Sequence, residues 1–514
     1  MIETRKTNIV TIIDFGSQYT QLIARRIREI GVYSEIVPYY TNLNGILEKS
    51  VCLIFSGSPK SVYDKDAPAL NIPLTSVGKP ILGICYGAQL IAYQLKGIVE
   101  KSKIREYGPT TIQIITDNLL FKNIPSSFKV WMSHSDHIKK IPKGFEILAR
   151  SSNNLVAGFA NERAKIWCVQ FHPEVYHTEY GKKILENFVY SCSGAYKNWD
   201  IKEEYKNVIN QLKETIAGNR VLCAVSGGID SLVTTVLISR VSNNIYPLFV
   251  DTGLLREKEF EKVKYCCNSL RIPIYKYDAS TMFLKELKNV IDPEKKRKII
   301  GKLFIKVFEG FAKKNGSIKY LAQGTLYPDI IESVSAYGAP SAKIKSHHNV
   351  GGLPKKINFK IVEPLKWFFK DEVRVIAKEL GIPDEFIRSQ PFPGPGFAIR
   401  IVGEVTQEKI NILRKAEIIV REEIEKNGLH SCLWQYFPIL LSTRSVGVMG
   451  DQRSYQYPIV LRLVKSVDGM TADWFYLDDK LLRKISNRIV NEVSGVNRVL
   501  VDITSKPPAT IEWE

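Results

Sequence analysis

The sequence predicts an α/β protein with two doubly wound α/β domains and a smaller C-terminal α+β domain. Three observations support this prediction: short apolar runs that end in loops of small residues, helical stretches between those runs, and a proline- and glycine-rich segment at 391–396 that ends the alternation. We place the domains at residues 1–197, 198–389 and 390–514. With 514 residues, 45% of them hydrophobic, the chain can fill several cores.

The N-terminal region begins with an apolar run at 9–13 that ends just before a helical stretch. The runs at 51–55 and 80–84 end in similar loops of small residues. This alternation is typical of a parallel sheet, and open α/β sheets bind their ligands beside the carboxyl ends of the strands. We therefore expect functional residues in the loop after each run.

The run at 80–84 leads directly into Cys85, on a tight strand-to-helix turn. Such a turn exposes the sulfur, and the helix N-terminus favours the thiolate that nucleophilic catalysis needs. Far downstream, His172 and Glu174 stand two residues apart. In an extended segment both side chains would point to the same side, so we predict that Glu174 orients His172 and that His172 serves as base for Cys85.

Three motifs in this region, GICYGAQ, QFHPE and the SGSP turn at 56–59, resemble the class I glutamine amidotransferases. Enzymes of that family hydrolyse the side-chain amide of glutamine. The resemblance implies Cys85 as nucleophile, His172 as base and Glu174 as orienting group. It also implies an oxyanion hole and a glutamine pocket built from Gly57, Tyr86, Gln89, Ser133, His134 and Asp136, the first two through their backbone N–H groups.

A second strand-to-helix turn, SGGIDS at 226–231, follows the apolar run 221–225. Its glycines allow close backbone approach, and a helix N-terminus attracts anions. No G-x-x-x-x-G-K-[ST] pattern is present, so this is not a Walker A element. The hexapeptide resembles the pyrophosphate loop of the ATP pyrophosphatases, which implies ATP binding by Ser226, Gly227, Gly228, Ile229, Asp230 and Ser231.

The rest of the chain supplies charged and irregular segments. The charge run at 292–301 is typical of a solvated helix start, although its basic residues could also bind a phosphorylated substrate. The loop at 344–354, with two histidines, a lysine and glycines, suits a mobile lid. Beyond 396 we expect helices and strands that make a small α+β domain, with helices at 410–424 and 481–493 and strands at 434–441 and 457–464.

Together with PFPGPG at 391–396 and KPPATIEWE at the end of the sequence, these motifs resemble the glutamine-hydrolysing GMP synthetases over essentially the whole chain. The resemblance implies that xanthosine 5′-phosphate (XMP), ATP and glutamine give GMP, AMP, diphosphate and glutamate through an adenylyl-XMP intermediate. It implies Mg²⁺ bound with ATP, no protein-only metal site, no prosthetic group, and a homodimer formed by the C-terminal domain. The implied XMP and lid residues are Arg297, Lys345, His347, His348, Asn349, Gln435, Lys506, Ile511 and Glu512.

Composition limits the other possibilities. Lys and Arg exceed Asp and Glu by 72 to 53, but the excess is spread along the chain, so we expect no nucleic-acid partner. The eight cysteines form no C-x-x-C pair and the histidines form no metal-binding spacing, which predicts reduced thiols and no structural metal. No apolar run approaches 18 residues and no secretion signal is present, so we expect a cytoplasmic protein without a membrane segment.

Two alternatives remain open at this stage. The chain could be another amidating or thiolating pyrophosphatase; a tRNA thiolase would suit the positive charge and the Cys266-Cys267 pair but would leave the predicted triad without a role. A catalytically silent nucleotide sensor is the non-enzymatic alternative. Turnover of XMP with glutamine or ammonium as donor separates these cases.

Overall fold

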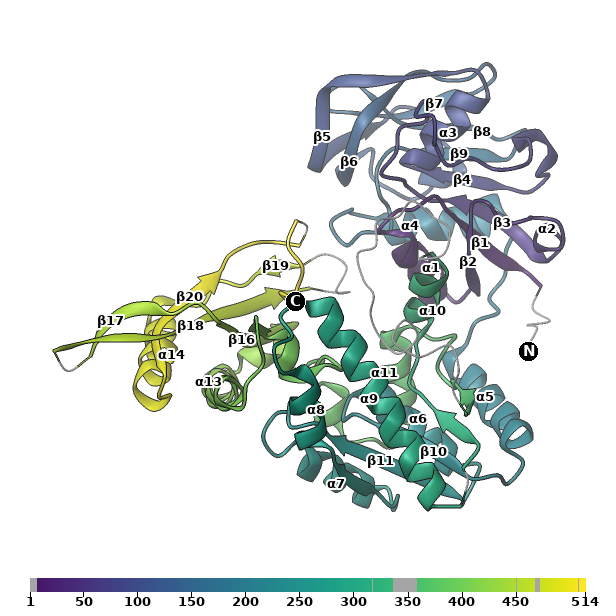
Figure 1. The fold of residues 1–514 in the computed structure, drawn as a ribbon. Coiled ribbons are helices and arrows are strands. Elements are labelled where there is room, and N and C mark those ends of the chain that lie inside the picture. Colours follow the sequence, from purple (N-terminus) through teal and green to yellow (C-terminus); the bar gives the residue numbers. More distant parts are fainter. Residues whose placement is uncertain (1–6, 317, 336–357, 450, 467–471, 507) are drawn as a thin grey trace. The chain divides into compact units, whose positions relative to one another are not determined.

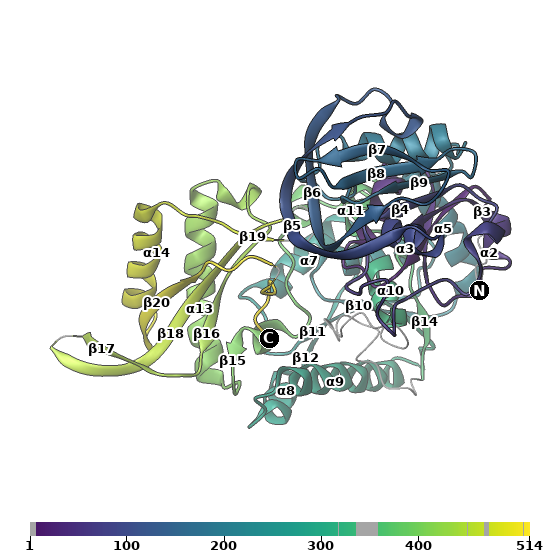
Figure 2. The same cartoon turned by 90° about the horizontal axis from the view of Figure 1, so that it is seen from above.

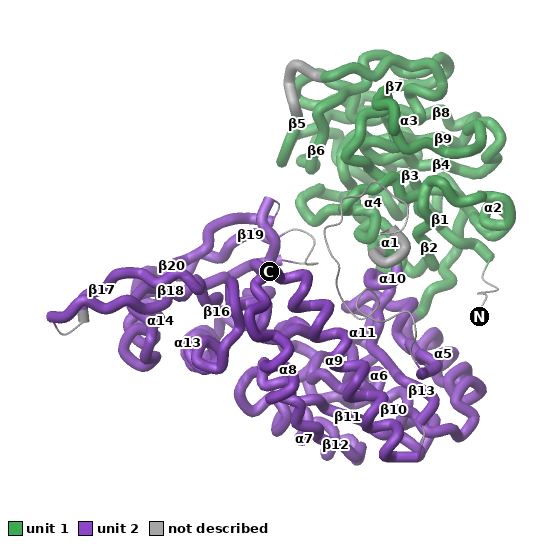
Figure 3. The backbone as a smooth tube through the Cα atoms, in the orientation of Figure 1, with its two compact units in different colours: residues 1–200, 331–344 green, residues 201–330, 345–514 purple. Residues whose placement is uncertain are grey.

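The structure is a computed structural model of the full chain. It describes residues 7–316, 318–335, 358–449, 451–466, 472–506 and 508–514. The chain forms two compact units, residues 1–200 with 331–344 and residues 201–330 with 345–514, which Figure 3 shows in two colours. Four residues of the predicted lid lie outside the described part of the chain: Lys345, His347, His348 and Asn349.

Unit 1 is built on a nine-stranded mixed sheet in the order β2-β1-β3-β4-β9-β8-β7-β5-β6 (Figure 1). Its first five strands pair in parallel and the others pair antiparallel. Most residues of the parallel strands are buried, which explains their continuous apolar runs, and the three predicted strands of this region are confirmed. The strands are β1 Ile9–Asp14, β2 Ser34–Pro38, β3 Ser50–Phe55, β4 Ile81–Ile84, β5 Ile98–Ile114, β6 Ser127–Lys140, β7 Glu146–Ser151, β8 Val156–Asn161 and β9 Ile166–Val169. The α-helices of unit 1 are α1 Thr20–Glu29, α2 Ile46–Lys49, α3 Tyr86–Gln94 and α4 Gly181–Glu186.

Residues 198–199, near the end of the first segment of unit 1, pack onto the body of that unit. The Trp199 ring lies 5.1 Å from the Tyr33 ring, and the Arg28 guanidinium lies 4.7 Å from the Trp199 ring. The Asn198 side chain accepts a hydrogen bond from the Tyr33 backbone N–H at 2.8 Å. These contacts attach residues 198–199 to the same unit as the nine-stranded sheet.

Unit 2 contains a five-stranded parallel sheet in the order β12-β11-β10-β13-β14. The chain moves outward from β10 to β11 and β12, then returns to the other side of β10 with β13, so the strand order reverses between β10 and β13. In open α/β sheets such a reversal opens a ligand crevice at the carboxyl ends of the two strands. The strands are β10 Val221–Val225, β11 Ile245–Asp251, β12 Tyr275–Asp278, β13 Tyr320–Ala322 and β14 Lys360–Val362. The helices of this part of unit 2 are α5 Ile201–Ile216, α6 Ile229–Ser239, α7 Glu259–Ser269, α8 Ser280–Leu287, α9 Pro293–Lys314, α11 Lys370–Glu379 and α12 Asp384–Ile387. Helix α10, Tyr327–Ser335, begins in unit 2, and its residues 331–335 are counted with unit 1.

The C-terminal part of unit 2 is a six-stranded sheet with two helices. Helix α13 (Gln407–Lys426) packs along β16, α14 (Asp479–Glu492) packs along β20, and the two helices lie against each other (Figure 2). The predicted α+β pattern is therefore confirmed, as is the mixed α/β class of the whole chain. The strands are β15 Ile401–Val402, β16 Gln435–Leu441, β17 Ser445–Met449, β18 Gln452–Lys465, β19 Asp473–Trp474 and β20 Val496–Asp502.

The segment at 391–396 contributes to the core that the two parts of unit 2 share, because Phe392 packs against that core. The residue that follows the segment extends this contact. Phe397 is fully buried in the same apolar cluster as Leu254, which follows β11, and the Phe397 backbone N–H donates to the Leu254 carbonyl at 2.8 Å. Residues 391–395 form neither a helix nor a strand, and Gly396 begins a short 3-10 helix, Gly396–Ile399. Within the described ranges, no helix is both long enough and apolar enough to cross a bilayer.

Candidate functional site

Cys85 lies at a sharp turn between β4 and α3. Its backbone has φ +52° and ψ −106°, a conformation that residues with a Cβ rarely adopt. Close packing holds the turn: a Cβ at Gly87 would lie 2.5 Å from the Phe55 carbonyl oxygen, and the Gly87 N–H donates to the Ser56 carbonyl at 3.0 Å. The position of the cysteine is therefore fixed by a strained turn that only a glycine at 87 permits.

His172 and Glu174 form the predicted pair. The His172 Nδ1–H donates to Glu174 Oε1 at 2.7 Å, and both side chains are buried. The pair forms although the chain leaves β9 at Val169 and turns at 173–174, so the extended geometry assumed from the sequence is not how the two side chains meet. The Tyr19 ring contacts His172 edge to face at 4.9 Å between centroids and restrains the imidazole.

The electrostatics of the His172–Glu174 pair favour the protonated imidazole. Burial favours the neutral ring, but the charge of Glu174 and the adjacent Cys85 raise the pKa of His172 to about 10. Because Nδ1 is engaged by Glu174, Nε2 is the nitrogen that faces the sulfur. The arrangement can therefore hold a proton beside Cys85 throughout neutral pH.

The predicted glutamine-pocket residues surround the same turn. Asp136 provides a carbonyl that accepts from Gln89 Nε2 at 2.9 Å and from His134 Nδ1 at 2.8 Å. The Ser133 carbonyl lies 3.8 Å from the Cys85 sulfur, whereas the alternation of β6 directs the Ser133 side chain away from the face that buries His134 and Asp136. Among the predicted residues of this pocket, Ser133 thus approaches the sulfur through its backbone.

The predicted oxyanion groups flank the triad. A Cβ at Gly57 would lie 3.5 Å from His172 Cε1, so the backbone at this position passes next to the imidazole. Tyr86 is the first residue of α3, where backbone N–H groups point out of the helix.

Sequence reasoning missed three unit 1 residues that complete this network. Gln170 accepts from Gln89 Nε2 at 3.2 Å and donates to the Cys85 sulfur at 3.7 Å. Ser61 and Tyr63 donate to the Asp136 carboxylate, Tyr63 at 2.8 Å. The signal for Gln170 was present, since it opens the QFHPE motif at the end of β9.

The SGGIDS segment forms the turn between β10 and α6 in unit 2. Gly227 has φ +89°, which favours glycine, and the Ser226 N–H donates to Ser231 Oγ at 3.1 Å. A Cβ at Gly324, which follows β13, would lie 2.8 Å from the Asp230 carbonyl carbon. The turn therefore lies at the point where the strand order reverses, with backbone donors and a helix N-terminus beside it.

Lys370, at the start of α11, is a partner of Asp230 that the sequence did not reveal. Its Nζ lies 3.3 Å from Asp230 Oδ2 and adds a positive charge to the turn. The other Asp230 oxygen, Oδ1, is buried and accepts no hydrogen bond within the described part of the chain. A buried carboxylate oxygen of this kind suits a divalent cation ligand.

The predicted XMP residues that the structure describes contact buried arginine side chains and backbone groups. Glu512 receives two hydrogen bonds from the guanidinium of Arg400, at 2.7 and 3.1 Å, and Arg400 is fully buried. Arg297 donates to a backbone oxygen of Glu514. The other contacts are Gln435 Nε2 to the Pro391 carbonyl, Arg462 Nε to the Ile511 carbonyl, and the backbone pairing of Lys506 with Ala472.

Each of the two units contains a segment that matches a known family. The family model for glutamine amidotransferase class-I matches residues 11–192, and the model for the GMP synthase C terminal domain matches residues 422–513. A crystal structure of a putative GMP synthase subunit from Thermoplasma acidophilum is 35% identical, covers 36% of this chain and 93% of its own, and has a TM-score of 0.33.

Curated relatives match over nearly the full length. GMP synthase [glutamine-hydrolyzing] of Caldicellulosiruptor saccharolyticus is 52% identical over 98% of this chain and 99% of its own. The chain belongs to the glutamine-hydrolysing GMP synthase family. The proteins of the same name from Aquifex aeolicus and Thermosipho africanus are each 51% identical, over 98% and 99% of this chain and 99% and 100% of their own. Membership makes the chain an ATP-dependent ligase of purine biosynthesis that carries a glutamine amidotransferase domain.

Proposed function

We propose that the chain converts XMP, ATP, glutamine and water into GMP, AMP, diphosphate and glutamate through an adenylyl-XMP intermediate. The observation that supports this best is the presence in one chain of two strand-to-helix turns with complementary chemistry. The Cys85 turn carries a nucleophile beside a buried His172–Glu174 pair, and the turn at 226–231 offers backbone donors to a phosphate.

The first turn would release ammonia. The Cys85 thiolate attacks the side-chain amide carbon of glutamine, and the N–H groups of Gly57 and Tyr86 receive the oxyanion. The C–N bond breaks as His172 gives its proton to the leaving nitrogen, which leaves a thioester on Cys85. Water then attacks the thioester, His172 takes the proton from that water, and glutamate departs as the thiolate returns.

The second turn would activate the base. The 2-oxo oxygen of XMP attacks the α-phosphorus of ATP, the bond from that phosphorus to the bridging oxygen breaks, and the diphosphate leaves. Residues 226–231 and the N-terminus of α6 stabilise the departing diphosphate. Ammonia then attacks C2 of the adenylylated base, AMP leaves with the oxygen, and one proton is lost.

Two charged side chains of unit 2 would assist this half-reaction. The orphaned Asp230 Oδ1 fits Mg²⁺ bound with ATP, and this ion would neutralise phosphate charge. Lys370 would add a fixed positive charge beside the phosphates. Neither role requires a prosthetic group.

XMP would bind through Arg297, Gln435, Lys506, Ile511 and Glu512, with a lid contributed by Lys345, His347, His348 and Asn349. We place the enzyme in the cytoplasm and assign it a homodimer formed through the C-terminal sheet. Exposed apolar side chains on and beside β17 and β20 support this dimer: Val446, Val448, Leu500 and Ile503.

A pair of variants tests the division of labour. Cys85→Ala should abolish glutamine-dependent formation of GMP and retain ammonium-dependent formation, because it removes only the nucleophile. Asp230→Asn should reduce synthesis with either donor and leave glutamine hydrolysis intact. Steady-state turnover of XMP with each nitrogen donor measures both; loss of both activities in Cys85→Ala would contradict the assignment of the amide chemistry.

A further inference from the structure

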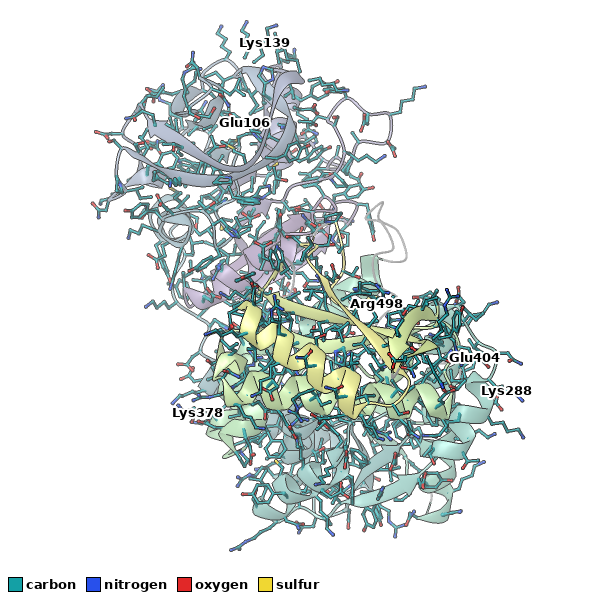
Figure 4. The ribbon with its side chains drawn as sticks, turned by 90° about the vertical axis from the view of Figure 1, so that its left-hand side faces the viewer. Glu106, Lys139, Lys288, Lys378, Glu404 and Arg498 are labelled. Carbon is teal, nitrogen blue, oxygen red and sulfur yellow. The ribbon has the colours of Figure 1, made fainter. Side chains whose placement is uncertain are left out.

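A buried carboxylate–imidazole pair lies beside the proposed glutamine pocket. Glu106 on β5 and His134 on β6 are direct cross-strand partners, and Glu106 Oε2 lies 3.3 Å from His134 Nε2. Their side chains are only 2% and 3% exposed. Figure 4 shows Glu106 within the strands of unit 1, whereas Lys139, on the neighbouring strand β6, projects at the margin.

Hydrogen bonds to other groups define the orientation of this pair. His134 Nδ1 lies 2.8 Å from the Asp136 carbonyl, which can only accept, so Nδ1 carries a hydrogen. Burial opposes ionisation of Glu106, but the adjacent His134 and the hydrogen bonds from Asn153 and Ser151 lower its pKa, so it faces Nε2 as a carboxylate. His134 thus turns its Nε2 edge toward this carboxylate at 3.3 Å, while its Nδ1–H is held by the Asp136 carbonyl.

The carboxylate is itself anchored. Glu106 Oε1 accepts from Ser151 Oγ at 2.8 Å and from Asn153 Nδ2 at 2.9 Å. These two donors lie at and just after the end of β7, so the pair is held by β5, β6 and the turn after β7. An anchored charge of this kind can fix the orientation of the ring that it contacts.

A chain of polar groups connects the pair to the proposed nucleophile. The Asp136 carbonyl that receives His134 Nδ1 also receives Gln89 Nε2, at 2.9 Å. Gln89 contacts Gln170 at 3.2 Å, and Gln170 donates to the Cys85 sulfur at 3.7 Å. Displacing His134 would therefore disturb the pocket wall next to Cys85.

We propose that Glu106 is a positioning residue for glutamine: its pairing with His134 fixes the Asp136 carbonyl and, through it, the side chains that surround Cys85. This inference rests on the proposed role of Cys85 as the nucleophile. It assigns to Glu106 no contact with substrate. Its loss should weaken glutamine binding without changing the reactivity of the thiol itself.

The chain offers a matched control on the same two strands. Glu100 and His137 are also cross-strand partners of β5 and β6, at 3.6 Å, but Glu100 is 41% exposed and also pairs with Lys139. Glu106→Ala, Glu106→Gln and Glu100→Gln should be compared for glutamine KM and kcat, ammonium-dependent synthesis, and alkylation of Cys85 by iodoacetamide. Glu106→Gln preserves volume, so it gives a result even if the alanine variant does not fold.

Glu106→Ala should raise the glutamine KM about tenfold, because it removes the anchored carboxylate that lies 3.3 Å from the buried ring nitrogen. Glu106→Gln should raise it about threefold, since the amide keeps the volume and a polar group beside the ring. Glu100→Gln should change it less than twofold, and ammonium-dependent synthesis and alkylation should match the parent protein in all three. A glutamine KM within twofold of the parent in Glu106→Gln, or a fall in kcat alone, would overturn the proposal.

Cys85→Ala separates this outcome from failure of the proposed function. If that variant still hydrolyses glutamine, the nucleophile is misassigned. If it does not, while the Glu106 variants bind glutamine normally, only the positioning role is wrong.

Discussion

The two strand-to-helix turns of this chain have a similar local topology but different internal construction. At Cys85 a residue with a Cβ is held at φ +52°, and the neighbouring His172 and Glu174 side chains are buried and hydrogen-bonded to each other. At 226–231 the positive φ belongs to a glycine, Gly227, and the contacts within the turn are mostly between hydroxyl groups and backbone.

This difference follows from what each turn has to supply. A covalent catalyst needs one reactive atom in one place, and neighbouring structure must stabilise a strained conformation to keep it there. A phosphate site needs many weak donors at close range, which a flexible backbone at a helix N-terminus provides. The activity at the first turn should therefore be sensitive to loss of a single charged side chain. Phosphate binding at the second turn should be sensitive to added atoms that block the backbone N–H groups.

Glu174→Gln should have the largest effect of the variants that probe this contrast. The carboxylate raises the pKa of His172 and selects its tautomer, so glutaminase kcat should fall about 10³-fold while ammonium-dependent synthesis is kept. In the parent protein the imidazolium persists across neutral pH and is lost as the pH rises through about 10. The basic limb of kcat against pH should therefore move to lower pH in the variant; an unmoved limb would show that another group controls it.

Adding one methyl group within the Cys85 turn, or against the turn at 226–231, should separate the two activities. Gly87→Ala places a Cβ 2.5 Å from the Phe55 carbonyl oxygen and Gly324→Ala places one 2.8 Å from the Asp230 carbonyl carbon. Each should lower its own activity about 10- to 100-fold through overpacking: glutaminase for Gly87→Ala, synthesis with either donor for Gly324→Ala. Gly310→Ala, on α9 with nothing within 4 Å, is the control and should leave both rates within twofold. Loss of both activities in either variant would mean that the damage spreads beyond its turn.

Lys370→Ala should have the smallest effect. Its ammonium is about one-third exposed and lies 3.3 Å from Asp230, so solvent screening limits its contribution. The KM for ATP should rise about tenfold with either donor, and glutaminase should not change. Lys378→Ala, on the same helix and labelled at the surface in Figure 4, is the matched control. Equal KM values for the two variants would remove Lys370 from the phosphate site.

Much of the fold could be predicted because its signals are local. The apolar runs at 9–13, 51–55 and 221–225 are strands, the helix expected at 410–424 lies within α13, and the helix expected at 481–493 matches α14 except for its last residue. Both functional turns could be located because strand, turn and chemistry occupy a few consecutive residues. Their assigned roles stay predictions until the variants are measured.

The remaining site residues could not be predicted because their contacts depend on strand register and on partners that are distant in the sequence. Lys370 stands 140 residues from Asp230, and Glu106 meets His134 only because β5 and β6 pair at that position. The charge run at 292–301 was expected to be solvated, yet Lys296 within it is fully buried, where its ammonium donates to the carbonyls of Ala398 and Ile401 and to Glu514. No periodicity of the run itself reveals those acceptors.

The packing of Trp199 has a practical consequence for dissecting this enzyme. The match to the amidotransferase family ends at residue 192, but a fragment cut there would strip the indole from Tyr33 and Arg28 and uncover an aromatic surface. A fragment that extends to Asp200 keeps this cover and should stay monodisperse at concentrations where the shorter one precipitates. A fragment that contains only the glutamine amidotransferase region should therefore end at Asp200.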